Sequence, residues 1–464
     1  MFKKSFLLIT LVVIVLATVL KDLIPLSPPF LMGLITLVIV TWWILEIVPI
    51  PVTALMPVVL MPLFRITSAD AVAQTYMNSV LMMFVGGFII AAAMEKTQLH
   101  KRLALRVILY FGVAPSGLIK GFLFATVTIS MWISNTATTV MMIPIASGVL
   151  AQLGDQLEKK DLKKFSTAIF LSIAYAASIG GMGTPVGTPT NLVFMKMYQE
   201  QYPTHEKIYF LEWLQLGVPL VLILMTFTYF LLKHMYFKNL NMNYDRTQLA
   251  GQLQKMGPMK YEEKWVIGLF VLLSVLWILR PFILPDYIDD GMLAIAVALL
   301  IFFIPTREEK MGILNADVFQ TIPWDTILLF GGGFAIALGM SESGLSNVLA
   351  EHLVRLDGMP NWAIISGVVI LVCLLSEVAS NMATIQIILP IIFALCNGLD
   401  LEPKNLALAA TFAASTGFML PAATAPNALV YGTRKVSIRE MARSGFVLDI
   451  VAIIVIAIYF SFMA

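Results

Sequence analysis

The chain has 464 residues, of which 59% are hydrophobic and only 12% are charged. Soluble domains carry roughly 25% charged residues, so this composition excludes an ordinary soluble domain and predicts a polytopic membrane protein. The two cysteines lie in apolar stretches and indicate neither a disulfide framework nor a metal centre. A net charge of +2 without a basic patch gives no sign of a nucleic-acid partner.

Apolar runs follow one another along the whole chain, each near the length that crosses a bilayer as a helix. We expect about eleven transmembrane helices, at residues 5–21, 30–48, 52–64, 79–94, 166–194, 213–233, 265–284, 289–304, 324–341, 405–431 and 444–462. Lys3 and Lys4 precede the first run as in a signal peptide. No small-residue cleavage site follows, so we expect this helix to be retained.

Two further apolar segments, 115–151 and 361–397, are interrupted near the middle by a Ser-Asn motif. Each half has about 15 residues, which is short for a span. We therefore expect two re-entrant helical hairpins whose polar tips are buried in protein.

The two hairpins belong to an internal repeat. "SNTATTVMMIPI" begins at residue 134 and "SNMATIQIILPI" at residue 380, an offset of 246. "NSVLMMFVGGF" (78–88) aligns with "WDTILLFGGGF" (324–334) at the same offset. After each hairpin comes a second matched pair, "AASIGGMGTPVGTPTN" (176–191) and "AASTGFMLPAATAPN" (413–427), with one residue of slippage. Such a duplication predicts two structurally equivalent halves.

Charge predicts that the two halves have opposite orientations. Residues 95–106 carry four Lys or Arg and one Glu, whereas their counterparts 341–352 carry two Glu and no Lys or Arg. Basic segments stay in the cytoplasm, so the repeats are expected to be inverted. With the basic segments 158–164, 233–264 and 434–443 inside, the N-terminus is cytoplasmic and the C-terminus lies outside.

Inverted repeats with interrupted helices indicate a secondary transporter with a midplane binding site. Ser134-Asn135-Thr136, Thr188-Pro189 and their counterparts in the second half are helix-start signals. Four helix N-termini aimed at one place favour an anion. Segments 121–150, 166–195, 361–396 and 405–431 contain no Lys, Arg or His, and their one acid is Glu377. Bound cations are then expected to offset the charge of the anion, which favours sodium over proton coupling.

Other interpretations are weaker. Ser, Thr and Gly often only pack membrane helices, but four motifs in two matched pairs are unlike isolated packing residues. Glu46 and Glu377 are interpreted as structural acids bonded to backbone or hydroxyl groups, with coupling residues as the alternative. A membrane enzyme would need a motif such as "HExxH" or paired aspartates, which is absent, so no enzyme is expected. A channel would show one pore-lining ring instead of two interrupted helix pairs.

At this point the chain resembles the divalent-anion:sodium symporter (DASS) family of sodium-coupled di- and tricarboxylate carriers. The resemblance covers the whole chain and is based on "EIVPIPVTALMP" (46–57), "SNTATTVMMIPI", "GTPVGTPTN" (183–191), "SEVASNMATIQIILPI" (376–391) and "PAATAPN" (421–427). It implies an all-α elevator-type homodimer. Its scaffold would comprise residues 1–110 and 265–357, its transport domain residues 111–212 and 358–464, and a connecting helix and basic loop would occupy 213–264.

The resemblance also implies the site residues. The first sodium site would use Ser130, Ser134, Asn135 and Gly183. The second sodium site would use Ser376, Ala379, Asn381 and Ala423. The substrate carboxylates would meet Asn135, Thr136, Thr184, Asn381, Met382 and Thr424. No organic cofactor is implied beyond the co-transported Na⁺.

Two positions depart from the family. Met382 stands where many dicarboxylate carriers have Thr, and Ala425 stands where Pro is common. The expected function is Na⁺-coupled uptake of C4-dicarboxylates such as succinate, malate and fumarate across a bacterial inner membrane. A citrate or sulfate symporter, or a sodium-independent exchanger on the same fold, remains the alternative.

Overall fold

The computed structural model describes residues 26–153, 157–205, 207–237, 240, 246–306, 312–353, 358–399 and 401–463. Within these ranges every regular element is a helix, apart from one isolated bridge between Pro305 and Gly312. The predicted all-α class is therefore confirmed. The expected first span, 5–21, lies outside the described residues.

The elements are listed here in chain order. They are α2 (Pro28–Leu45), α3 (Ile50–Ala54), α4 (Met56–Leu63), α5 (Ala69–Thr75), α6 (Ser79–Lys96), α7 (Leu99–Phe111), α8 (Pro115–Ser130), α9 (Asn135–Leu153), α10 (Lys159–Gly181), α11 (Pro189–Gln201), α12 (Phe210–Leu232), the π-helix η1 (Lys233–Phe237), α13 (Arg246–Lys255), α14 (Tyr261–Ile283), α15 (Asp290–Phe303), α16 (Val318–Thr321), α17 (Trp324–Glu342), α18 (Leu345–Leu353), α19 (Asn361–Val378), α20 (Asn381–Leu399), α21 (Pro403–Ala413), α22 (Ala425–Gly432) and α23 (Ile438–Ser461).

Ten helical stretches in the described ranges are long and apolar enough to cross a membrane, and two shorter apolar stretches, Ile50–Leu63 and Asp290–Phe303, accompany them. Each expected span inside the described ranges corresponds to one of these helices or to a broken pair of helices. The hairpin arms are longer than expected, because α9, α19 and α20 have 19, 18 and 19 residues. They nevertheless form hairpins, since α8 packs on α9 and α19 packs on α20.

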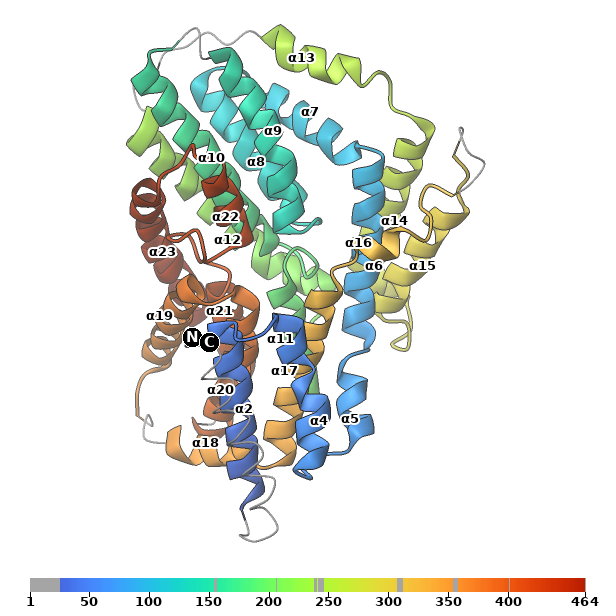
Figure 1. The fold of residues 1–464 in the computed structure, drawn as a ribbon, viewed down its shortest axis with the longest axis vertical. Helices are drawn as coiled ribbons and strands as arrows, with labels where there is room; N and C mark the ends of the chain where they lie inside the picture. Colours follow the sequence, from blue (N-terminus) through green and yellow to red (C-terminus); the bar gives the residue numbers. More distant parts are fainter. Residues whose placement is uncertain are drawn as a thin grey trace.

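The repeat is visible in the helix boundaries. Helix α9 spans residues 135–153 and α20 spans residues 381–399, so both of their ends differ by the offset of 246 found in the sequence. Figure 1 shows hairpin α8–α9 in the upper half of the molecule and hairpin α19–α20 in the lower half. The two hairpins thus approach the middle of the molecule from opposite ends, as inverted repeats require.

The two halves are interlocked at their broken helices. Helix α11 of the first repeat packs against α20 and α21 of the second, and α22 of the second repeat packs against α9 and α10 of the first. Each short half-helix therefore completes the hairpin of the other repeat. This exchange brings all four interrupted segments into one region at the centre of the fold.

Helices α7 and α18 lie outside the expected spans and include most of the segments 95–106 and 341–352 that were compared by charge. Both are short amphipathic helices that link the preceding span to a hairpin. Neither helix forms a continuous apolar run, because polar and charged residues alternate with the apolar ones along its sequence. Arg102 on α7 is 2% exposed because it donates to both oxygens of Glu263 at the start of α14, at 2.5 and 3.0 Å. This buried ion pair anchors α7 at the basic end of the molecule.

Glycine lets α6 and α15 approach closely, as small residues do between membrane helices. A Cβ atom placed on Gly86 would lie 2.6 Å from the backbone carbon of Ala294. By contrast, a Cβ atom on Gly268 of α14 would meet nothing within 4 Å. Gly86 is therefore a contact residue, and Gly268 is a matched position without a contact.

The substitution Gly86→Val should destabilise the protein by about 1–3 kcal/mol, because its side chain overpacks the α6–α15 contact. Thermal unfolding of the purified protein in detergent measures the effect. Gly268→Val is the control and should leave the midpoint nearly unchanged. Equal shifts for the two variants would mean that the α6–α15 contact is not as close as described.

Candidate binding site

Each hairpin is broken by a serine that caps the second helix. The Ser134 Oγ accepts a hydrogen bond from the Ala137 backbone N–H at 3.3 Å, and the Ser380 Oγ accepts one from Ala383 at 3.2 Å. Helices α9 and α20 consequently begin at Asn135 and Asn381. Both predicted helix starts are confirmed, and the two tips have the same local structure.

Three oxygen atoms converge beneath each tip. The Ser130 Oγ lies 2.8 Å from the Asn135 Oδ1 and 2.7 Å from the Ala177 carbonyl oxygen. In the second repeat the Ser376 Oγ lies 2.7 Å from the Asn381 Oδ1 and 2.6 Å from the Ala414 carbonyl oxygen. A hydroxyl has one proton, so each trio holds more acceptor oxygens than it can satisfy itself. Such clusters suit a hard cation, which prefers oxygen ligands.

Helix α10 leaves room for the amide of the first trio. A Cβ atom on Gly181 would lie only 2.5 Å from the Asn135 Oδ1. In the second repeat, a Cβ atom on Gly417 would lie 3.1 Å from the Ser376 carbonyl oxygen. Glycine therefore lets the end of α10 lie directly against the first tip, and lets the unwound segment at residue 417 lie against Ser376 and Ala423 in the second repeat.

The unwound segments are held by two equivalent buried asparagines. The Asn191 Nδ2 donates to the carbonyl oxygens of Gly181 and Thr184 at 2.9 and 2.7 Å. The Asn427 Nδ2 donates to those of Gly417 and Leu420 at 3.1 and 3.0 Å. Both side chains are fully buried. They satisfy carbonyl groups that the helix break would otherwise leave unpaired in an apolar interior.

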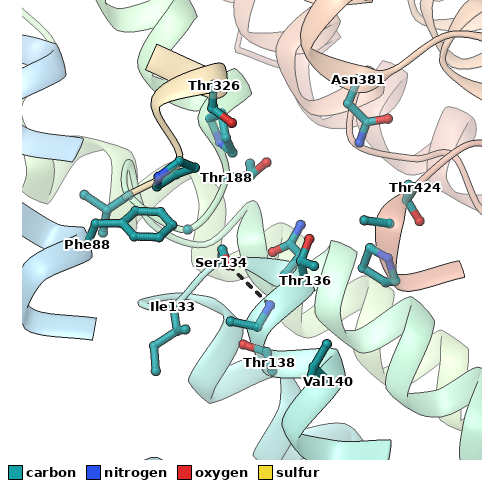
Figure 2. A pocket seen from close by; sticks show the side chains of 18 of the residues that line it. Phe88, Ile133, Ser134, Thr136, Thr138, Val140, Thr188, Thr326, Asn381 and Thr424 are labelled. Atoms are coloured by element: carbon teal, nitrogen blue, oxygen red, sulfur yellow. Dashed lines mark hydrogen bonds between the residues drawn. The ribbon is translucent and has the colours of Figure 1, made fainter. Parts of the chain in front are cut away.

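A cavity of about 810 Å³ lies where the four helix starts meet. Its wall includes residues at the start of α9, α20, α11 and α22, together with residues of α6 and α17. Figure 2 shows Thr136, Thr188, Asn381 and Thr424 around the same space. The prediction that four helix N-termini point at one place is therefore confirmed.

Most of the predicted substrate and cation residues lie at this cavity. The wall contains Ser134, Asn135, Thr136, Asn381, Met382, Ala423 and Thr424. Ser130 and Ser376 are fully buried behind the tips and contact the two asparagines. Ala379 ends α19 in an extended conformation, next to the Ser380 cap.

Gly183 and Thr184 are exceptions to this pattern. The Thr184 side chain is fully buried, donates to the Met131 carbonyl oxygen and accepts from the Gly187 N–H. It is Gly187 and Thr188 that line the cavity.

The internal repeat explains why Gly187 and Thr188 line the cavity, four residues after the expected Gly183 and Thr184. Asn191 corresponds to Asn427 through equivalent hydrogen bonds, so Thr188 corresponds to Thr424 and Gly187 to Ala423. Thr188 and Thr424 also share an extended backbone immediately before their helices. The sequence contains "GTP" twice, at 183 and at 187. Aligning "GTPTN" with "ATAPN" would have selected the second copy.

The cavity wall contains no Lys or Arg among the described residues, and its ionisable groups are Glu95, His100 and Asp325. Glu95 lies at the end of α6, His100 on α7 and Asp325 at the start of α17. Glu95 and His100 lie where α6 leads into the basic helix α7. The cavity thus reaches from the hairpin tips toward α7.

A protein-family model described as the sodium:sulfate symporter transmembrane region matches residues 1–463. The chain belongs to the sodium:sulfate symporter family. The match spans nearly the whole chain and confirms the resemblance found in its motifs.

Relatives within this family are named for transport. The sodium-dependent dicarboxylate transporter SdcS of Staphylococcus saprophyticus is 38% identical over 447 residues, covering 92% of this chain and 85% of the relative. SdcS of Staphylococcus aureus is 39% identical over 442 residues, covering 92% and 84%. Both relatives are transporters, and neither name describes an enzyme.

Solved structures share the fold at low identity. The YdaH transporter of Alcanivorax borkumensis matches with a TM-score of 0.56 at 12% identity, covering 84% of this chain and 85% of that one. MtrF of Neisseria gonorrhoeae matches with a TM-score of 0.57 at 12% identity, covering 84% and 83%. At this identity the likeness concerns architecture alone.

The placement of Thr188 and Thr184 can be tested by chemical labelling. In a background with Cys373→Ala and Cys396→Ala, Thr188→Cys should react readily with a charged methanethiosulfonate reagent, because residue 188 lines the cavity. Thr184→Cys should react at least about tenfold more slowly, since reactivity requires an accessible thiolate and residue 184 is fully buried. Faster labelling at 184 than at 188 would contradict this wall.

Proposed function

We propose that this chain is a sodium-coupled symporter of C4-dicarboxylates such as succinate, malate and fumarate. One observation carries the proposal. Four helix N-termini surround a cavity whose described lining residues include no Lys or Arg, and an oxygen trio lies under each hairpin tip. The wall therefore favours an anion, and the trios favour cations. The names of the two staphylococcal relatives support the same pairing of dicarboxylate with sodium.

Electrostatic magnitudes favour coupling over simple anion binding. One partly buried helix N-terminus stabilises a negative charge by up to about 2 kcal/mol, so four contribute at most about 8 kcal/mol. Removing a dianion from water costs several kcal/mol for each carboxylate. The helix termini alone leave little net affinity. Two bound sodium ions would supply the missing positive charge, so that the dianion binds well only after sodium.

The proposed ligand sets follow the geometry. The first sodium ion would be held by Ser130, Ser134, Asn135 and Gly187, with Gly187 replacing the expected Gly183. The second would be held by Ser376, Ala379, Asn381 and Ala423. The dicarboxylate would contact Asn135, Thr136, Thr188, Asn381, Met382 and Thr424, with Thr188 replacing the expected Thr184.

Transport would proceed by an elevator motion within a homodimer in the bacterial inner membrane. Residues 111–212 and 358–464 would move as the transport domain against a scaffold formed by 1–110 and 265–357. The N-terminus would be cytoplasmic and the C-terminus outside, as the basic segments indicate. The cavity reaches toward α7 on this basic side, so the described conformation would be open to the cytoplasm.

The alternatives concern the anion and the coupling. Met382 occupies the cavity position equivalent to Thr136 and removes one hydroxyl group from the wall. This asymmetry keeps citrate and sulfate as competing substrates. A sodium-independent exchanger would need a fixed positive charge near the anion, and the part of the chain that the structure describes places no Lys or Arg on the wall.

Labelled succinate should accumulate against its gradient in proteoliposomes with an inward Na⁺ gradient, and should not when K⁺ or choline replaces Na⁺. Competition by malate, citrate and sulfate ranks the substrates. Uptake that is independent of Na⁺ but requires dicarboxylate inside the proteoliposomes would identify an exchanger. Succinate transport that only runs down its own gradient would identify a channel or uniporter.

Removing either trio hydroxyl should weaken sodium binding. Ser130→Ala and Ser376→Ala are each expected to raise the Na⁺ concentration for half-maximal uptake by about tenfold, which corresponds to ~1.4 kcal/mol. Ser366→Ala is the matched control, because Ser366 also lies on α19 but is partly exposed, and its hydroxyl donates to the Trp362 carbonyl oxygen. An unchanged Na⁺ dependence in both trio variants would exclude these cation sites.

A further inference from the structure

A pair of buried hydroxyl groups joins the two repeats beside the cavity. The Thr190 Oγ1 lies 3.1 Å from the Ser415 Oγ. Thr190 is the second residue of α11 in the first repeat, and Ser415 follows the end of α21 in the second. Both side chains are buried. Neither residue belongs to the sodium or dicarboxylate ligands proposed above.

In the second repeat, Ser415 is attached to a proposed cation site. The carbonyl oxygen of the preceding residue, Ala414, accepts the Ser376 hydroxyl at 2.6 Å and belongs to the second oxygen trio. The Ser415 backbone N–H donates to the Phe412 carbonyl oxygen at 3.1 Å, which continues the last turn of α21. A displacement of Ser415 would therefore also move an oxygen atom of the second trio.

In the first repeat, Thr190 is attached to the other unwound segment. Its hydroxyl lies 3.4 Å from the Asn191 Oδ1. The Nδ2 of the same amide donates to the carbonyl oxygens of Gly181 and Thr184. Gly181 in turn lies against the Asn135 side chain of the first trio. A chain of buried polar contacts thus runs from one trio to the other through this pair of hydroxyl groups.

One arrangement of protons satisfies this chain. A hydroxyl group has one proton to donate and can also accept a hydrogen bond. When Ser415 donates to Thr190, and Thr190 donates to the Asn191 Oδ1, both protons are used and the amide oxygen has a partner. Buried polar groups are costly to leave unpaired. The arrangement therefore stabilises the contact between the two repeats.

The equivalent contact is missing on the opposite side of the site. Ser178 corresponds to Ser415, because each follows the alanine whose carbonyl oxygen completes a trio. Pro426 corresponds to Thr190, because each precedes the asparagine that holds an unwound segment. Proline has no hydroxyl group. In the described part of the chain, neither the Ser178 Oγ nor the Asn427 Oδ1 has a hydrogen-bond partner, although both residues are buried.

This difference separates the hydroxyl pair from the packing that surrounds it. Helix α22 packs against α10, as α11 packs against α21. Both halves therefore exchange their helices, but one of them alone joins the exchanged helix to the neighbouring serine. The bond between Thr190 and Ser415 is thus an addition to the repeated fold and is not required by it.

We propose that Thr190 and Ser415 are positioning residues that couple the two sodium sites, an inference that rests on the proposed symport. Their contact holds the unwound segment of the first repeat against the backbone of the second trio. An ion that orders one trio then helps to order the other. Coupling of this kind is reciprocal, so each site binds sodium more tightly while the hydroxyl pair is intact.

The test removes either hydroxyl group and measures sodium binding without transport. Thr190→Val and Ser415→Ala should each raise, by about fivefold, the Na⁺ concentration that half-maximally stabilises the purified protein against thermal unfolding, with choline chloride as the reference salt. That factor is the size expected for one net hydrogen bond. The double variant should be no weaker than either single variant, because both remove the same contact. Thr190→Ser keeps the hydroxyl group and should retain the wild-type Na⁺ dependence.

Ser178→Ala is the matched control. Ser178 occupies the position equivalent to Ser415 and is also buried, but its hydroxyl has no partner among the described residues. This variant should have the Na⁺ dependence of the wild type. A shift as large as that of Ser415→Ala would contradict the inference, since either serine would then act through the local packing of its own trio.

Thr190 also lines the cavity, so the half-maximal succinate concentration for uptake is measured separately. If Thr190→Val raises that concentration but leaves the stabilisation by Na⁺ unchanged, Thr190 is a substrate contact and the inference is overturned. Fully additive shifts in the double variant would also overturn it. If Thr190→Val does not fold, an unchanged Na⁺ dependence in Ser415→Ala is sufficient to reject it. A wild-type protein that neither binds Na⁺ nor needs it for uptake would overturn the proposed symport as well.

Discussion

Four helices stop inside an apolar interior, and the backbone groups freed by each break must be satisfied there without water. The rest of the structure follows from that constraint. Ser134 and Ser380 cap two of the new helix starts, while Asn191 and Asn427 bind carbonyl groups on the unwound segments. Gly181 lets α10 lie directly against the first hairpin tip, and Gly417 lets the second unwound segment approach Ser376. The N–H groups left over at the four helix starts then face a common cavity and form its anion-favouring wall.

The helix breaks could be predicted from the sequence because capping is local chemistry. A serine followed by Asn and an apolar run fixes a start within one residue, and both hairpins begin their second helix where this pattern places it. Helices α7 and α18 were missed because their charged residues lie on one face of short helices, which an inspection for apolar runs does not detect. The local motif does not distinguish the two "GTP" copies, and the position of Thr188 at the cavity follows from its place three residues before Asn191, as Thr424 precedes Asn427.

Some features of the structure depend on tertiary contacts, and no local sequence pattern predicts them. The sequence predicts Glu377 to be a structural acid bonded to backbone or hydroxyl groups, and Glu377 accepts the backbone N–H groups of Met419 and Leu420. These partners lie 42 and 43 positions further along the chain, and no local pattern identifies them. The two repeats also differ where their roles differ. Thr136 in the first hairpin corresponds to Met382 in the second, and Met131 corresponds to Glu377. Equivalent folds can thus carry different side chains at equivalent positions of the two halves.

The exchange of half-helices between the repeats also governs how the chain can be assembled. Helix α11 is synthesised well before its partners α20 and α21. Hairpin α8–α9 is completed only when α22 has been synthesised, and the first residue of α22 comes 272 positions after the end of α9. Until then, polar tips and unwound segments of the first half have no partner in the bilayer. Long-range pairing of this kind is slow, and incompletely paired intermediates are prone to misassembly. The nascent first half would therefore depend on retention in the insertion machinery until the second half is complete, and truncation anywhere before α22 would leave an unfinished hairpin for proteolysis.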